Sequence, residues 1–70
     1  MDKAAVNLKL DSIEYCQHHL GTWQKLLRNA KRAGDEREIK EAEASIAYYS
    51  MLILGATEPE AHAQYKEMMK

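Results

Sequence analysis

The chain has 70 residues, which form one domain at most, and a domain of this size buries only roughly 60% of the surface that its unfolded chain exposes. Leu, Ile, Val and Phe supply only 12 residues, and three Gly, one Pro and one Cys exclude a turn-rich β fold and an internal disulfide. The net charge is −1, no apolar run approaches 18 residues and no signal-peptide pattern occurs, so we expect a cytoplasmic protein without a membrane span.

The first predicted helix covers about residues 3–33. One set of apolar residues repeats every seven positions: Val6, Ile13, Leu20 and Leu27. A second set lies three residues later in the chain and has the same spacing: Cys16, Trp23 and Ala30. This periodicity is typical of an amphipathic helix. Asp11 and Glu14 have the spacing of a capping box, so one alternative is a break at Asp11 that leaves residues 1–10 as a separate arm or short helix. Another alternative is a kink of the long helix near Asp11 or Gly21.

Two further helices follow from the glycines and the proline. Gly34 ends the first helix, and Asp35 with Glu38 begins a second over about residues 36–54. Its apolar positions have coiled-coil spacing: Ile39, Ala42, Ile46, Tyr49 and Ile53. After Gly55, a Thr57–Glu60 capping box with Pro59 in the first turn predicts a third helix over about residues 58–69.

These elements predict an all-α fold in a single domain, residues 1–70. We expect an antiparallel hairpin of the long first helix and the second helix, completed by the short C-terminal helix. The last turn of the second helix is apolar on every side, which one neighbouring helix cannot cover. We therefore expect a homodimer or higher homo-oligomer, assembled as a helical bundle, with Met51, Leu52, Ile53 and Leu54 at its interface.

Charge divides at Gly34. Residues 1–34 carry six Lys/Arg and three Asp/Glu, whereas residues 35–70 carry four and eight. The favoured interpretation is that the basic stretch before the turn pairs with the acidic residues that follow it. In the alternative, Lys25, Arg28 and Arg32 form an exposed stripe beside Trp23 and bind a small anionic ligand, such as a nucleotide, at a subunit interface. Single-stranded nucleic acid is a weaker candidate, and the slight acidity argues against duplex binding.

Catalytic and metal-binding patterns have little support. Glu14, Cys16, His18 and His19 are close in sequence, but Cys16 lies on the apolar stripe while Glu14 and His18 point away from it. A zinc site would need His62 or a second subunit, and no paired CxxC or HExxH motif occurs. We expect no metal, no cofactor and no enzymatic activity.

Aromatic residues off the apolar stripes are typical anchors of interfaces. Tyr15 and Tyr48 are such residues, and for Tyr48 packing beneath the third helix is an equal alternative. Together with His18, His19 and the outward part of the Trp23–Arg32 stretch they form the predicted contact surface for an unidentified macromolecular partner. The sequence thus favours a small non-catalytic adaptor, inhibitor or regulator that binds protein as a homo-oligomer.

Overall fold

The chain folds into three α-helices joined by two short turns. In the computed structural model, which describes the backbone of residues 2–70 and the side chains of residues 13–70, these are α1 (Asp2–Ala33), α2 (Glu36–Ile53) and α3 (Glu58–Met69). Residues 2–70 contain no strand, so the all-α prediction is confirmed. Each bound lies within one residue of the expected range.

The first helix is continuous. α1 passes through Asp11 and Gly21 without a helix boundary, so Asp11 is not an N-cap and the backbone of residues 2–10 belongs to the same helix. The alternative of a separate N-terminal arm is therefore wrong for these residues. The side chain of Val6, which extends the apolar stripe in the sequence, lies outside the described residues.

Glycine ends both α1 and α2 in the same way. Gly34 and Gly55 have φ angles of 72° and 103°, in the left-handed region that favours glycine. The residue after each glycine then donates a backbone hydrogen bond five residues back, Asp35 N to Ala30 O at 3.1 Å and Ala56 N to Met51 O at 2.9 Å. This pattern is the Schellman motif, which satisfies carbonyl groups at a helix C-terminus.

Both predicted N-caps are confirmed. The Asp35 carboxylate accepts from Glu38 N at 3.2 Å. Thr57 and Glu60 form the full capping box: the Thr57 hydroxyl accepts from Glu60 N at 3.3 Å, and Thr57 N donates to Glu60 Oε1 at 3.1 Å. The backbone N–H and the hydroxyl of Thr57, both donating to the Glu60 carboxylate, hold its pKa below the usual range.

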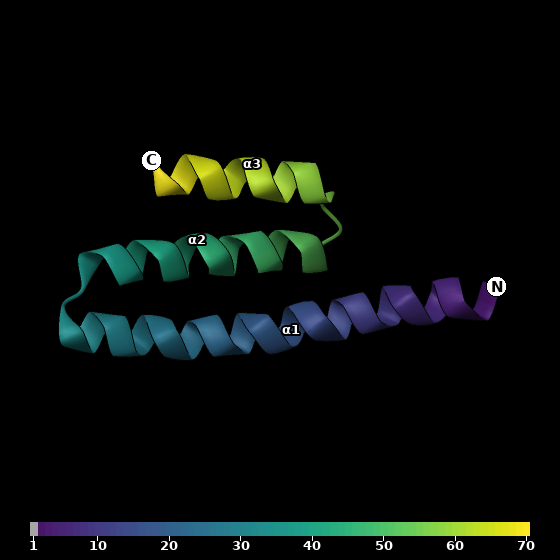
Figure 1. Cartoon of the computed structure of the whole chain (residues 1–70), viewed down its shortest axis with the longest axis horizontal. Coiled ribbons are helices and arrows are strands. Elements are labelled where there is room, and N and C mark those ends of the chain that lie inside the picture. Colours follow the sequence, from purple (N-terminus) through teal and green to yellow (C-terminus); the bar gives the residue numbers. More distant parts are fainter. Residues whose placement is uncertain (1) are drawn as a thin grey trace.

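The helices form a layer that is one helix thick. α2 lies between α1 and α3 and packs against both, whereas the backbones of α1 and α3 are not in contact in the part of the chain that the structure describes (Figure 1). The Cα atoms extend over 48 × 22 × 14 Å. The N-terminal part of α1 continues beyond the ends of the other two helices, as its greater length requires. Both broad faces of the layer are thus left uncovered by the chain itself.

The residues buried between the helices are small. Among the described side chains, five apolar residues and one serine are buried: Cys16, Ala30, Ala42, Ala44, Ala61 and Ser45. No large side chain of residues 13–70 is fully buried. Small residues allow the helix backbones to approach closely, and the larger apolar side chains lie beside the contacts, half-buried or exposed. Within residues 13–70 the single chain therefore buries little apolar surface.

Replacing Gly21 with alanine is expected to stabilise the protein. Gly21 is exposed within α1, and a Cβ added there meets no other atom within 4 Å. Alanine in a helix interior is about 1 kcal/mol more favourable than glycine, so the melting temperature should rise by roughly 4 °C. Thermal unfolding followed by circular dichroism measures this. Gly34→Ala is the matched control and should destabilise by about 1 kcal/mol, because residue 34 is left-handed; equal effects of the two substitutions would contradict the prediction.

Candidate functional site

Heptad spacing turns Trp23 toward α2. Cys16, Trp23 and Ala30 lie seven residues apart, and seven residues make nearly two helical turns, so the three share one side of α1. Cys16 and Ala30 are buried and Trp23 is half-buried. This side of α1 is thus the one that contacts α2, and the indole ring lies at the boundary of the two helices.

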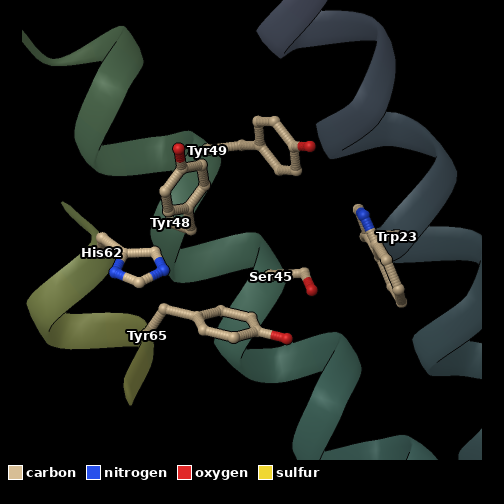
Figure 2. Close-up of a pocket in the computed structure, with 6 residues that line it drawn as sticks. All are labelled: Trp23, Ser45, Tyr48, Tyr49, His62 and Tyr65. Carbon is tan, nitrogen blue, oxygen red and sulfur yellow. The ribbon is translucent and has the colours of Figure 1, made fainter. Parts of the chain in front are cut away.

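A pocket of about 240 Å³ lies on one broad face of the layer, at the middle of the three helices. It is lined by one residue of α1, three of α2 and two of α3: Trp23; Ser45, Tyr48 and Tyr49; His62 and Tyr65. In Figure 2 the Trp23 ring lies across from Ser45, and the Tyr65 hydroxyl points into the space between them. The lining holds four aromatic rings besides the imidazole and carries no carboxylate, ammonium or guanidinium group.

The pocket belongs to a larger group of stacked rings, here called the aromatic cluster: Tyr15, His18, His19, Tyr48, Tyr49, His62 and Tyr65. His19 connects α1 to α2, because its ring stacks on Tyr49 with centroids 5.3 Å apart and an interplanar angle of 13°. Tyr48 connects α2 to α3 through an edge-to-face contact with Tyr65 at 6.3 Å. The cluster therefore crosses all three helices.

The rim of the cluster is accessible from solvent. Tyr15 lies 4.2 Å from His19 between ring centroids, yet 59% of Tyr15 remains exposed. His18 and His62 are exposed as well, whereas Tyr48 and Tyr49 are half-buried. Burial raises the pKa of Tyr49, and the neighbouring Tyr15, Tyr48, Cys16 and Tyr65 groups raise it further. The Tyr49 hydroxyl thus keeps its proton at neutral pH and can donate a hydrogen bond.

Four of the predicted partner-binding residues meet at this site, whereas the outward part of the Trp23–Arg32 stretch lies along the outer edge of α1. The structure brings Tyr15, His18, His19 and Tyr48 into the aromatic cluster, although they come from two helices. For Tyr48, packing against α3 is shown by the Tyr65 contact. Tyr49, His62 and Tyr65 belong to the same surface but were not predicted as contact residues from the sequence. The i, i+3 spacing of His62 and Tyr65 indicates that these two share a face, but their approach to α2 depends on tertiary packing.

The predicted oligomer residues at the end of α2 differ in exposure. Met51, Leu52 and Ile53 are half-buried, while Leu54 is 87% exposed. α3 covers part of this turn because it packs back against α2. Leu54, the C-cap residue of α2, is the most exposed of the large apolar side chains among residues 13–70.

The basic residues of α1 lie away from Trp23. Counting about 100° per residue, Lys25, Arg28 and Arg32 lie on average about 170° from Trp23 around the helix. All three are exposed, so they lie along the outer edge of α1, on the side that faces away from α2. The prediction that the indole ring lies beside this stripe is therefore wrong, because the ring and the cations lie on opposite sides of α1. A phosphate held by these cations would not meet that ring on the same chain.

Pairing of the basic stretch with the acidic residues after Gly34 is also not seen. Among residues 13–70, one ion pair has a nitrogen–oxygen distance below 4 Å: Lys70 Nζ lies 3.1 Å from Glu67 Oε2. Neither residue lies next to the Gly34 turn. The cations of the stripe point outward from α1, which is why they do not meet the carboxylates of α2. The favoured interpretation of the charge pattern was therefore wrong about close contacts between these side chains.

Cys16, one of the candidate metal ligands in the sequence, is buried in the contact between α1 and α2. Burial, with a smaller contribution from the Glu58 carboxylate, raises the pKa of the Cys16 thiol, which disfavours the reactive thiolate. Within the described residues, no three His, Cys, Asp or Glu side chains lie close enough to share a metal ion. None of the helices in the described part of the chain combines the length and apolar composition that a membrane span requires.

Comparison of the chain with protein-family models, with curated proteins and with solved structures found no match.

Proposed function

We propose that this chain is a small non-catalytic binding protein of the cytoplasm, which acts as a homo-oligomer and holds a macromolecular partner on its aromatic cluster. In this role it serves as an adaptor, inhibitor or regulator. The observation that carries the proposal is the extent of the cluster: seven tyrosine and histidine rings join on one surface that crosses all three helices.

The chemistry of the cluster suits binding of a protein surface. A tyrosine ring supplies a large contact area while fixing few rotatable bonds, and its hydroxyl group can still donate a hydrogen bond. Neighbouring rings support Tyr15 and His19, so little further ordering is needed on binding. The pocket beside Trp23 offers a recess for one apolar or aromatic side chain of the partner.

The raised pKa of the Cys16 thiol supports the non-catalytic part of the proposal. A protonated, buried thiol is a poor nucleophile, and Cys16 serves instead as a small residue in the contact between α1 and α2. Oxidation or alkylation at this position would add atoms to a close helix contact.

The proposed oligomer is built on an antiparallel hairpin of α1 and α2. Support comes from two pairs of residues, each with one residue from α1 and one from α2. His19 stacks on Tyr49, and Trp23 lines the pocket with Ser45. In both pairs the two residues lie nearly equally far along the chain from the turn. Helices that run in opposite directions from a shared turn produce this pattern.

Partner capture with Tyr15→Ala tests the proposal. Tyr15 is 59% exposed, so its removal is expected to leave the fold unchanged while deleting an anchor of the cluster. Binding to the captured partner should weaken on the order of 30-fold, the effect of losing an aromatic hot spot worth about 2 kcal/mol. Quantitative mass spectrometry of proteins retained from a cell extract, followed by titration of the purified partner, measures this loss.

Lys25→Ala is the control for that experiment. Lys25 is exposed on the outer edge of α1, away from the cluster, and its replacement should leave partner binding unchanged. Circular dichroism verifies that both variants keep the helical content of the unmodified protein. If all three proteins retain the same set at the same level, the aromatic cluster is not the binding surface and the proposal fails.

A further inference from the structure

Two rows of branched aliphatic side chains lie beside the contact between α1 and α2. In each helix they repeat every seven residues: Ile13, Leu20 and Leu27 on α1, and Ile39, Ile46 and Ile53 on α2. Three small residues, each three positions later in the chain than a member of these rows, are buried: Cys16, Ala30 and Ala42. None of the six aliphatic side chains is buried. In a coiled coil both sets are covered. Here the helix pair covers only the small set.

Both rows lie on the broad face opposite the aromatic cluster. Counting about 100° per residue, Leu20 is rotated about 60° to one side of Trp23, whereas His19 is rotated about 40° to the other. On α2, Ile46 and Tyr48 lie on opposite sides of Ala42 by the same count. In an antiparallel pair these rotations bring the two rows to one face, which we call the aliphatic face. The layer thus has one aromatic and one aliphatic side.

Charges of opposite sign flank the two rows. Lys31 follows Leu27 by four residues on α1, so it lies on the same side of that helix, and Glu43 lies beside the Ile39 and Ile46 row on α2. Both are exposed, and neither makes an ion pair within residues 13–70. A surface with a cation beside one row and a carboxylate beside the other can pair with a copy of itself turned by 180°.

We propose that a second copy of this chain covers the aliphatic face, with α1 of each copy lying over α2 of the other. This inference rests on the proposed homo-oligomer and names the face through which it forms. α2 has 18 residues and is about 27 Å long, and two helices side by side are roughly 20 Å wide. Two such faces bury on the order of 1,100 Å² in total, just above the roughly 1,000 Å² expected of a specific interface.

In this dimer the six aliphatic side chains of each copy form the core that the monomer lacks. Lys31 of one copy lies near Glu43 of the other, twice, because the arrangement is symmetric. The aromatic clusters then face outward on the two sides of the assembly, where both remain accessible to a partner. Dimerisation and partner binding therefore use opposite faces of the same layer.

Leu20→Glu, with Leu26→Glu as the matched control, tests which face dimerises. Leu26 is 43% exposed and lies on the aromatic side of α1. Light scattering coupled to gel filtration should give about 16 kDa for the unmodified chain, twice its 8.0 kDa. Leu20→Glu should raise the dimer Kd on the order of 100-fold, because it buries a charge, while Leu26→Glu remains dimeric.

Charge exchange tests the arrangement without disturbing the apolar residues. Lys31→Glu and Glu43→Lys should each weaken the dimer, and the double variant should restore the affinity of the unmodified chain. Arg32→Glu makes the same change on the outer edge of α1 and should have a smaller effect. Because all three positions are exposed, these variants are expected to fold. Weakening that accumulates in the double variant would overturn the placement of α1 over α2.

The outcomes separate this inference from the proposed function. A dimer that survives Leu20→Glu, or one that is lost only with Leu26→Glu, overturns the aliphatic face as the interface but leaves a homo-oligomer standing. An unmodified chain of 8.0 kDa at high micromolar concentration overturns both the inference and the oligomeric part of the proposal. Partner capture by the aromatic cluster is measured independently of either result.

Discussion

Ala61→Leu is expected to destabilise the protein by about 2 kcal/mol, because added methylene groups in a close-packed contact force neighbouring side chains and backbone to shift. Ala61 has no exposed surface and lies where α3 packs against α2. A chain this short has little stability to lose, so the variant is expected to be partly unfolded at 37 °C. Urea denaturation followed by circular dichroism measures the change in the free energy of unfolding.

Ala63→Leu is the matched control for this substitution. It makes the same change in the same helix, but Ala63 is exposed, so the added side chain meets no packed neighbour. Its free energy of unfolding should stay within about 0.5 kcal/mol of the unmodified protein. Similar losses at the two positions would mean that α3 is destabilised by leucine in general, and that close contact with α2 is not the cause.

The melting temperature is expected to rise with protein concentration. If the folded state is a dimer and the unfolded chains are separate, mass action stabilises the folded form as the concentration increases. A tenfold increase adds about 1.4 kcal/mol per dimer, which for two chains of 70 residues raises the melting temperature by roughly 5 °C. Differential scanning calorimetry over a hundredfold range of concentration measures this.

A melting temperature that stays constant over that range would contradict the proposed homodimer. The Leu20→Glu variant serves as an internal comparison, because a monomeric form should lose both the concentration dependence and much of the stability. The experiment needs no knowledge of the interface geometry. It therefore tests self-association separately from the assignment of the aliphatic face.

The two faces of the layer offer separate surfaces for the proposed dimer and for the proposed partner, although the chain has few apolar residues. Small residues at the helix contacts, such as Ala42 and Ala44, bring the backbones close together. The large apolar residues are then left on the broad faces, aliphatic on one side and aromatic on the other. In the proposed dimer, a second copy covers the aliphatic face and completes a core, while the aromatic face keeps its rings accessible for the proposed partner.

The helix boundaries could be predicted from the sequence because they depend on local chemistry. Gly34 and Gly55 adopt left-handed conformations that other residues avoid, and the Thr57–Glu60 capping box forms within four residues. The same holds for the heptad pattern that turns Trp23 toward α2. The position of the Lys25–Arg32 stripe was also contained in the helical period, but proximity in sequence suggested a shared surface that the rotation of the helix prevents.

The sequence by itself determined where each helix begins and ends, and which of its sides is apolar, because these properties arise from neighbouring residues and from the helical period. Only the tertiary structure decided that His19 stacks on Tyr49 and that Tyr48 meets Tyr65. Those contacts depend on the axial register of separate helices. A shift of one helical turn along either neighbour would move these rings about 5 Å apart without changing any local preference, so close packing of the small residues between helices selects the register.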